Sequence, residues 1–480
     1  MSMRDQAQSI GTAQIRNSVT PKATAIQLIF MIYSVICSGA YGLESMVSAS
    51  GPGLAMLILL VLPVIYAAPM ALTCSELTAR YPVEGGYYRW VRMAFGDFVG
   101  YNVGWLVWLT MFATNASFAV LFTNYLRYFA PDLSGAAHFV ISAALVWIVV
   151  LLNYRGIGLV GAASVILTVI IIIPFAIMTV MGLLSWGSNP MAPFVNSDRS
   201  LAAAVFGGIP TAIWLYGGFE RMTVSAEEVE NPVRAFPLAL GIGVPLCALS
   251  YIAPTFAGLA ANGDWRDWGE SYFTTSAAKI GGAWLGAFMA AGALVSNMSI
   301  LLTTMLSQSR LPMVLAEDGL FPRIFERRHP RFGSPVASLV VTGMALTGFC
   351  VLRLDELIGI YAIVQSIAYL LIYATLIKLR YKSDKTDGTG FRIPVGVGGL
   401  VLMVLPSAMI GVFVVYRGVF TEGNSDAGRI LLHLLIFASG PITFFLARLR
   451  RRKLKSEPGE TTPSRLNMAE SENPQPASKN

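Results

Sequence analysis

Long apolar runs without charged residues recur along the chain, separated by short polar segments. Residues 54–68, 164–184 and 336–351 contain no Asp, Glu, Lys or Arg. The core of a bilayer is about 30 Å thick and takes about 20 helical residues to cross, a length that these runs approach or reach. The pattern predicts about twelve transmembrane helices, at residues 24–47, 53–78, 98–126, 137–153, 157–184, 201–219, 236–261, 280–307, 335–352, 355–377, 397–416 and 428–447.

The composition agrees with this interpretation and leaves no room for a large soluble domain. The 480 residues are 55% hydrophobic and only 13% charged, whereas a soluble domain carries roughly 25% charged residues. We therefore predict an all-α membrane protein. It has a cytoplasmic tail at 1–23, one transmembrane domain at 24–447, and a basic and then disordered cytoplasmic tail at 448–480.

The distribution of Lys and Arg predicts the orientation. If the N-terminus lies inside, 27 of the 34 basic residues fall in inner segments, and basic residues are retained on the cytoplasmic side. Both termini are therefore expected in the cytoplasm of a plasma (inner) membrane. The net charge of +7 then reflects topology and not a nucleic-acid surface. The basic run 448–455 is either an ordinary flank of this kind or a binding site for anionic lipid.

Side chains that serve enzymes and metal sites are scarce. The three histidines, His138, His329 and His433, lack the spacing of metal ligands, and the four cysteines fall in apolar spans without a pairing pattern. The chain also has no phosphate-binding loop motif. We therefore predict no enzyme activity, no metal and no cofactor. The expected partners are a small-molecule substrate and the lipid bilayer.

Spans 1 and 6 each contain a cluster of small residues followed by a carboxylate. Glycine favours unwound backbone, and polar groups freed by unwinding cost several kcal/mol in lipid unless protein or ligand satisfies them. The two spans run in opposite directions, and broken spans at corresponding places in two halves indicate an inverted-repeat transporter with its site at the breaks. The predicted substrate-binding residues are Ser38, Gly39, Ala40, Tyr41, Gly42 and Glu44 in span 1, and Tyr216, Gly217, Gly218, Phe219 and Glu220 in span 6.

The ends of broken helices offer both hydrogen-bond donors and hydrogen-bond acceptors to a substrate. A half-helix that starts near Gly42 aims free N–H groups at the site, whereas half-helices that end near Ser38 and Tyr216 aim free carbonyls at it. An amino acid needs both kinds of group. A polyamine needs only acids and aromatic faces, for which Tyr41 and Phe219 are the best aromatic candidates.

The carboxylates near the breaks have two interpretations. Acidic residues in the first turn of a helix offset its dipole, so Glu44 and Glu220 could simply cap their half-helices. A carboxylate at membrane depth also usually faces a cavity or a partner, which makes both residues candidates for substrate contact and for carrying a coupled proton. Glu76 ends the second span four residues before Arg80, where we predict a surface cap or an ion pair.

Four motifs, in the expected order between about residues 25 and 400, resemble those of the amino acid–polyamine–organocation superfamily of permeases. The first resembles S-G-G-P-[FY]-G-x-E, a pattern of the branch that contains plant and protozoal polyamine permeases. The second resembles the E-x5-P-x-x-G-G-x-Y signature after the second helix. The others resemble the sixth helix with its following loop, and the eighth-to-ninth loop. They lie at 38–44, at 76–87, at 217–220 with 227–232, and at 309–310 with 316–322 and 333–335.

The resemblance implies two inverted repeats of five helices, at about 24–184 and 201–377, with two additional helices at about 397–447. It also implies alternating access and transport of amino acids or amines, commonly driven by protons. The chain departs from the family in two ways. Many amino acid permeases have a G-[SA]-G break, where this chain has Gly39-Ala40-Tyr41-Gly42, and some proton-coupled members carry a lysine in helix 5, where this chain has no Lys or Arg between Gly156 and Trp186.

We therefore predict a secondary active transporter of amino acids, coupled to protons through Glu44 or Glu220. A polyamine symporter or exchanger is the alternative, because the acids and aromatic residues of the breaks also suit a substrate without a carboxylate. A non-transporting nutrient sensor is a remote alternative. The sequence gives no indication of the oligomeric state.

Overall fold

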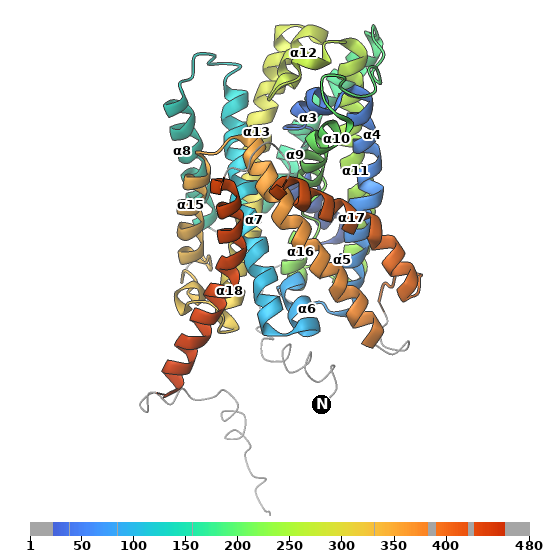
Figure 1. Ribbon diagram of the computed structural model, residues 1–480. Helices are drawn as coiled ribbons and strands as arrows, with labels where there is room; N and C mark the ends of the chain where they lie inside the picture. Colours follow the sequence, from blue (N-terminus) through green and yellow to red (C-terminus); the bar gives the residue numbers. More distant parts are fainter. Residues whose placement is uncertain are drawn as a thin grey trace, which may run out of the picture.

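The computed structural model describes residues 23–37, 39–83, 85–155, 157–330, 332–382, 390–420 and 427–456, and within these ranges it is built from helices (Figure 1). Their bounds are α2 Ala25–Ile36, α3 Glu44–Ser50, α4 Pro52–Leu62, η2 Pro63–Ala67, α5 Ala68–Arg80, α6 Gly86–Phe95, α7 Asp97–Leu126, α8 Gly135–Tyr154, α9 Ile157–Leu184, α10 Leu201–Leu215 and η3 Arg221–Glu228. The second half continues with α11 Pro232–Ala261, η4 Trp265–Asp267, α12 Tyr272–Gly281, α13 Ala283–Gln308, α14 Arg310–Glu317, η5 Arg323–Glu326, α15 Val336–Phe349, α16 Leu354–Lys382, α17 Val397–Phe420 and α18 Ala427–Ser456.

Each predicted span coincides with helix in the structure. Seven helices in the described part of the chain are long and apolar enough to cross a membrane, and five shorter apolar helices accompany them. The long ones are Pro52–Arg80, Asp97–Leu126, Gly135–Tyr154, Pro232–Ala261, Ala283–Glu317, Leu354–Lys382 and Val397–Val419. The short ones are Ala25–Ile36, Ile171–Leu184, Leu201–Leu215, Val336–Phe349 and Leu435–Leu449.

Local sequence signals explain where several of these helices begin. The Thr24 hydroxyl accepts a hydrogen bond from the Gln27 backbone while the Gln27 side chain accepts one from Thr24 N–H, which forms a capping box before α2. Ser134 and Ser200 are the N-caps of α8 and α10, and each hydroxyl accepts a hydrogen bond from the backbone N–H three residues ahead.

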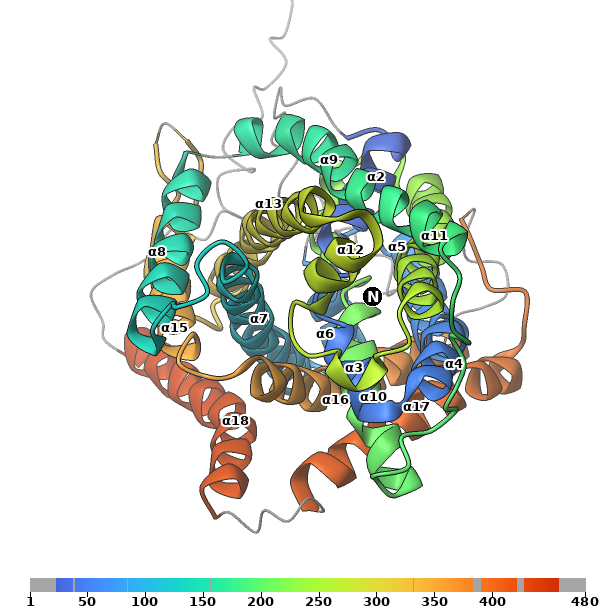
Figure 2. The same ribbon diagram turned by 90° about the horizontal axis from the view of Figure 1, so that it is seen from above.

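The helices differ strongly in how much of their surface is enclosed. Helix α7 is almost wholly buried and packs against α8, α13 and α16. In the view from above, α3 lies inside the bundle and α10 runs inward from its edge, whereas α8, α15 and α18 lie at the edge (Figure 2). The interruptions themselves are enclosed, because residues 39–44 and 211–220 are buried, whereas the beginnings of the two spans reach the surface at Ile26 and Leu201.

The outward faces of the peripheral helices are apolar. Leu60 on α4, Leu151 on α8, Leu249 on α11 and Leu402 on α17 are all largely exposed. A soluble monomer rarely shows contiguous apolar patches of this kind, whereas a bilayer covers them with lipid tails. Together with the long apolar helices, this surface identifies an integral membrane protein.

The prediction that Glu76 lies at the surface is wrong. Its side chain is fully buried, and its two carboxylate oxygens accept hydrogen bonds from Arg380 Nε at 2.9 Å and Nη2 at 2.6 Å. The predicted ion pair with Arg80 exists but is longer, at 3.8 Å. The buried Glu76 carboxylate is stabilised because the planar Arg380 guanidinium donates two hydrogen bonds to it. Arg380 is far from Glu76 in the sequence, so spacing along the chain did not indicate this partner.

Candidate functional site

The first span is interrupted where the glycine cluster predicted a break. Helix α2 ends at Ile36, and regular helix resumes only at Glu44. Gly39 and Gly42 between them have φ angles of 104° and 91°, a region that side chains other than glycine rarely adopt. Ser38 lies outside the described residues.

The sixth span is interrupted in a similar way. Helix α10 ends at Leu215, Tyr216 forms its C-cap, and Gly218 has a φ angle of 107°. A 3-10 helix, η3, begins at Arg221 and leads away from the break. Because α2 and α10 both terminate here, the last carbonyls of both helices lack the intrahelical partners that a continuous helix would supply.

A tyrosine of the seventh span holds the two helix ends together. The hydroxyl of Tyr251 on α11 lies 3.2 Å from the Ile36 carbonyl oxygen and 3.1 Å from the Leu215 carbonyl oxygen. Its ring also packs edge-on against Tyr216, with 5.3 Å between centroids. The Tyr251 hydroxyl is therefore a hydrogen-bond partner for the last carbonyl of each broken helix, and it holds the ends of α2 and α10 close together.

A small cavity of about 20 Å³ lies at this junction. It is lined by residues from spans 1, 3, 6, 7 and 8, namely Ile36, Cys37, Gly39, Tyr41, Phe118, Trp214, Leu215, Tyr251, Ser296, Asn297 and Ile300. A cavity needs about 10–15 Å³ to hold one water molecule. The central cavity is therefore closed to any amino acid or amine in this conformation, and substrate entry requires the helices to move.

Glu44 does not line the central cavity. Its Oε2 accepts a hydrogen bond of 2.8 Å from the Gly42 N–H, and its Oε1 accepts one from the Tyr125 hydroxyl. The side chain is fully buried in the first turn of α3. Gly42 precedes Leu43, the N-cap of α3, so the carboxylate satisfies an N–H group of the unwound segment and makes no side-chain capping bond to α3 itself; its charge still lies at the positive end of the α3 dipole.

Glu220 lies beyond the break in span 6 and faces the tenth span. Its Oε1 accepts from Gln365 Nε2 at 2.9 Å, and its Oε2 accepts from the Tyr369 hydroxyl at 2.7 Å. The same hydroxyl accepts a 3.0 Å hydrogen bond from the Gly218 N–H. Tyr369 thus connects the carboxylate directly to the unwound backbone.

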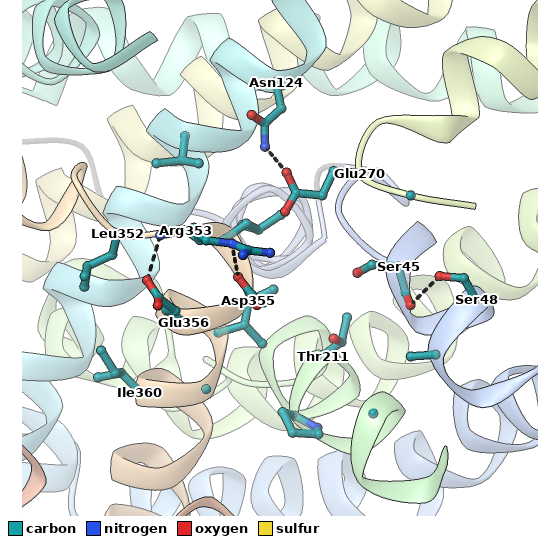
Figure 3. Close-up of a pocket in the computed structure, with 18 of the residues that line it drawn as sticks. Ser45, Ser48, Asn124, Thr211, Glu270, Leu352, Arg353, Asp355, Glu356 and Ile360 are labelled. Atoms are coloured by element: carbon teal, nitrogen blue, oxygen red, sulfur yellow. Dashed lines mark hydrogen bonds and ion pairs between the residues drawn. The ribbon is translucent and has the colours of Figure 1, made fainter. Parts of the chain in front are cut away.

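A much larger cavity opens above the breaks, at the end of the bundle that the basic residues predict to be outside. It has a volume of about 1510 Å³ and reaches down to Ser45 and Ser48 on α3 and to Thr211 on α10 (Figure 3). We refer to it as the outer vestibule. Ser45 directly follows Glu44, so the floor of the vestibule and the central cavity are separated by the first turn of α3 and by side chains of the breaks.

Charged residues of both signs line the outer vestibule. They are Asp198, Glu270, Asp355, Glu356, Arg127, Arg199, Arg266, Arg353 and Arg417. Glu270 accepts a 2.5 Å hydrogen bond from Asn124 and points toward Arg353 (Figure 3). Partial burial and then Asp355 raise the pKa of Glu270, against the opposing effect of Arg353 and Arg127.

The structure brings together only part of the predicted site. Gly39 and Tyr41 line the central cavity, whereas Ala40 and Phe219 are buried without lining it. The Tyr216 hydroxyl donates to the Leu59 carbonyl, and Gly217 packs against Tyr361. The glycine cluster therefore located the interruption in span 6, but the residues facing the cavity there are Trp214 and Leu215, just before it.

Several cavity residues had no distinctive signal in the sequence. Phe118 and Ile300 look like ordinary apolar positions of a span. Ser296, Asn297 and Tyr251 are polar residues within apolar segments, which is the signal that could have identified them. Among the described residues, no group of three or more His, Cys, Asp or Glu side chains has the arrangement of a metal site.

The close packing around Gly217 predicts that a side chain at this position would impair transport. A Cβ atom added there would lie 2.8 Å from the Ile213 carbonyl oxygen and would collide with the Tyr361 hydroxyl. Overpacking of this kind costs about 1–3 kcal/mol, so we expect Gly217→Ala to reduce substrate uptake by roughly tenfold or more. Uptake would be measured in proteoliposomes at equal protein content.

Gly241 on α11 provides a matched control for this substitution. A Cβ atom there meets nothing within 4 Å, and alanine is a better helix former than glycine by about 0.8–1 kcal/mol. Gly241→Ala should therefore transport normally. Equal uptake by the Gly217 and Gly241 variants would contradict a requirement for glycine at the break.

Comparison with known proteins identifies the family whose sequences this chain matches. The amino acid permease family matches residues 24–433. Polyamine transporter RMV1 of Arabidopsis thaliana is 33% identical over 402 residues, which cover 82% of this chain and 80% of the relative. Polyamine transporter PUT1 of Oryza sativa subsp. japonica is 33% identical over 395 residues, 81% of this chain and 72% of the relative. Cationic amino acid transporter 4 of Mus musculus is 27% identical over 376 residues, 72% of this chain and 58% of the relative.

Proposed function

This chain belongs to the amino acid permease family and is a membrane transporter, and from that premise we propose that its substrate is a polyamine. The sequence alone favoured amino acids, with polyamines as the alternative. Two relatives that are 33% identical are named polyamine transporters, whereas the relative named for cationic amino acids is only 27% identical. These similarities support the alternative over the leading prediction.

The observation that carries this proposal is the position of the Glu44 carboxylate. An amino acid needs a receptor for its own carboxylate, and the free N–H groups of the unwound segment before α3 are the natural candidates. Glu44 already occupies the Gly42 N–H at 2.8 Å. A substrate carboxylate would have to displace this negative group at close range, whereas a substrate with only ammonium groups meets no such competition.

The remaining groups of the central cavity suit a cation. The carbonyl ends of α2 and α10 at Ile36 and Leu215 carry the partial negative charge of two helix C-termini. The rings of Tyr41, Phe118 and Trp214 offer π faces, which attract ammonium groups in a desolvated site. Among the described residues that line this cavity, none is Lys or Arg, so no fixed positive charge opposes a polyamine.

The transport cycle that fits these features is alternating access around the breaks. We propose two inverted repeats, at about 24–184 and 201–377, with two additional helices at 397–447. Both termini are cytoplasmic in this arrangement, and the outer vestibule is the entrance from outside. The closed central cavity corresponds to a state in which substrate access is blocked until one side opens.

Glu220 is our candidate for coupling to protons. It is a fully buried carboxylate whose partners, Gln365 and Tyr369, belong to the tenth span. Gln365 Oε1 is buried without a hydrogen-bond partner. A flip of this amide would let it accept a hydrogen bond from a protonated Glu220, so the pair can satisfy both protonation states. No lysine of the fifth span is required.

Substitution of Glu44 tests the proposed substrate class. Glu44→Ala should free the Gly42 N–H, and a hydrogen bond between that group and a substrate carboxylate is worth about 1.5–3 kcal/mol. We therefore expect leucine to inhibit putrescine uptake about 10- to 100-fold more strongly in this variant than in the wild type. Inhibition by spermidine should change much less. The measurement is competition against labelled putrescine in proteoliposomes.

Glu44→Gln is the matched control, because the glutamine oxygen can still accept from Gly42 and keep the amide covered. It should gain no inhibition by leucine. A wild-type protein that takes up amino acids and ignores putrescine and spermidine would rule out the polyamine proposal. If leucine inhibits putrescine uptake equally in Glu44→Ala and in the wild type, then Glu44 does not keep a substrate carboxylate from the Gly42 N–H, although the substrate could still be a polyamine.

A further inference from the structure

A buried arginine directly follows the break in span 6. Arg221 is the first residue of η3, and only 5% of its surface is exposed. Arg380, which is buried to a similar degree, donates two hydrogen bonds to the Glu76 carboxylate. Among the described side chains, no carboxylate forms an ion pair of this kind with Arg221. A buried charge without an ionic partner is costly, which indicates that Arg221 has a role beyond packing.

The guanidinium of Arg221 lies against Tyr361 of the tenth span. Its Nη2 donates a hydrogen bond of 3.3 Å to the Tyr361 hydroxyl, and its Cζ lies over the ring at 5.7 Å from the centroid. An aromatic face attracts cations within about 6 Å of its centroid, and an ammonium group of a substrate would use the same face. Arg221 therefore already occupies a buried cation site just beyond the break.

This site adjoins the unwound backbone of span 6. A Cβ atom added to Gly218 would lie 3.0 Å from the Arg221 Cζ, and one added to Gly217 would collide with the Tyr361 hydroxyl. Leu215, which lines the central cavity, comes three residues before Gly218, and such a stretch spans at most about 11 Å. In the proposed orientation span 6 runs inward, so a substrate that leaves the central cavity for the cytoplasm passes Arg221.

Polyamines differ in how far their charges reach. Putrescine is a short diamine, whereas spermidine is longer and carries a third ammonium group. Arg221 does not line the central cavity, so it does not directly contact a short diamine held there. An additional ammonium group that extends toward the cytoplasm comes within about 10 Å of the guanidinium. At this distance, and at an effective dielectric constant of about 20, repulsion between two unit charges changes an equilibrium constant about tenfold.

The neighbouring carboxylate does not form a contact pair with this charge. Glu220 accepts hydrogen bonds from Gln365 and Tyr369, whereas Arg221 donates to Tyr361. In the proposed cycle Glu220 also binds the coupled proton, and its protonation removes the negative charge that opposes Arg221. The repulsion is then strongest while the proton and the substrate are bound together.

We propose that Arg221 is a specificity-determining residue that makes this transporter favour diamines over polyamines with three or more ammonium groups. Its guanidinium repels the additional charge and occupies the Tyr361 face that would otherwise bind it. An unfavourable contact with the competing ligand is one of the two general routes to specificity. The inference rests on the proposed polyamine function and narrows the substrate to the shorter members of that class.

Displacement of labelled putrescine from the purified full-length protein tests this inference without relying on transport. In the wild type, unlabelled putrescine should displace the label at a lower concentration than spermidine. Arg221→Gln can still donate a hydrogen bond to Tyr361 but carries no charge, so the ratio of the two inhibition constants should shift about tenfold in favour of spermidine. Arg221→Lys keeps the charge and should keep the wild-type ratio. Glu220 is present in every variant, so the comparison isolates the charge of Arg221.

Arg234→Gln is the matched control. Arg234 is an exposed residue in the first turn of α11, on the same side of the break. Its substitution removes an equal charge that water and salt already screen, so the ratio should not change. A general disturbance of the fold would weaken both ligands alike and leave the ratio unchanged, which separates specificity from structure. In proteoliposomes, the kcat/KM values for the two amines should show the same shift in Arg221→Gln.

Several results would overturn the role of Arg221. One is a wild type that binds spermidine more tightly than putrescine, a measurement that needs no variant. The others are an unchanged ratio in Arg221→Gln, or an equal shift in Arg221→Lys or Arg234→Gln. Each of these results would leave the polyamine proposal standing. A protein that binds neither amine would refute the proposed function, and this inference with it.

Discussion

Replacing Glu220 by glutamine is expected to abolish uphill accumulation of substrate while leaving exchange of substrate across the membrane intact. A symporter that moves one proton per substrate gains about 1.4 kcal/mol for each pH unit of gradient, which is tenfold in the substrate ratio. If Glu220 carries that proton, its removal reduces the ratio of internal to external substrate to about one at any pH gradient. Accumulation and counterflow would both be measured in proteoliposomes with an imposed gradient.

The structure indicates that this variant will fold. Glutamine has the size of glutamate, and its amide nitrogen would face Gln365, whose unpartnered Oε1 can accept from it after an amide flip. The remaining oxygen can still accept from Tyr369, which therefore keeps its hydrogen bond from the Gly218 N–H. A complete loss of exchange as well as accumulation would indicate a structural role and contradict the proton-carrier assignment.

Glu230 supplies the control for this experiment. It is an exposed carboxylate shortly after η3, ten residues from Glu220. Glu230→Gln removes the same charge from the same region, and it should accumulate substrate like the wild type. Loss of accumulation in both variants would show that the effect is not specific to the buried carboxylate.

The second large effect is expected for Arg380→Met, which should destabilise the folded protein by about 3–5 kcal/mol, the typical cost of leaving a buried charge without its partner. Arg380 donates two hydrogen bonds to Glu76, one of 2.8 Å to the Ile393 carbonyl and another to the Val395 carbonyl. Ile393 N–H also donates to Glu76 at 3.0 Å. These contacts connect α5, α16 and the segment before α17, and the variant loses the two connections that α16 makes while the bond between Ile393 and Glu76 remains.

Unfolding in detergent by denaturant titration would measure this change, and two further variants make it specific. Arg266→Met breaks an exposed ion pair with Asp198, at 3.3 Å and more than half exposed on both sides, and should cost at most about 1 kcal/mol. The double variant Glu76→Gln/Arg380→Met also removes the fully buried carboxylate and leaves only the longer-range partner Arg80, which is less deeply buried, so it should be more stable than Arg380→Met alone. Equal stability of Arg380→Met and the wild type would mean that the ion pair does not hold these elements together.

The sequence by itself determined the helical spans and the two interruptions. Apolar runs must form helices in a bilayer, because every backbone polar group there needs a partner within the chain. The glycine clusters at 39–42 and 217–218 predicted where helix α2 and helix α10 end, and the motifs around them resembled the family to which the chain belongs. Both signals are local, and local signals can be found without knowing which helices are neighbours.

Only the tertiary structure decided which side chains meet across the spans. Glu44 pairs with Tyr125, Glu220 with Gln365 and Tyr369, and Glu76 with Arg380. The partners are up to 304 positions apart in the sequence, and spans whose outer faces are uniformly apolar carry little periodic pattern to specify a neighbour. The sequence therefore identified the acids but not the groups that neutralise or bind them, and it did not indicate Trp214 and Leu215, which line the central cavity beside the break in span 6.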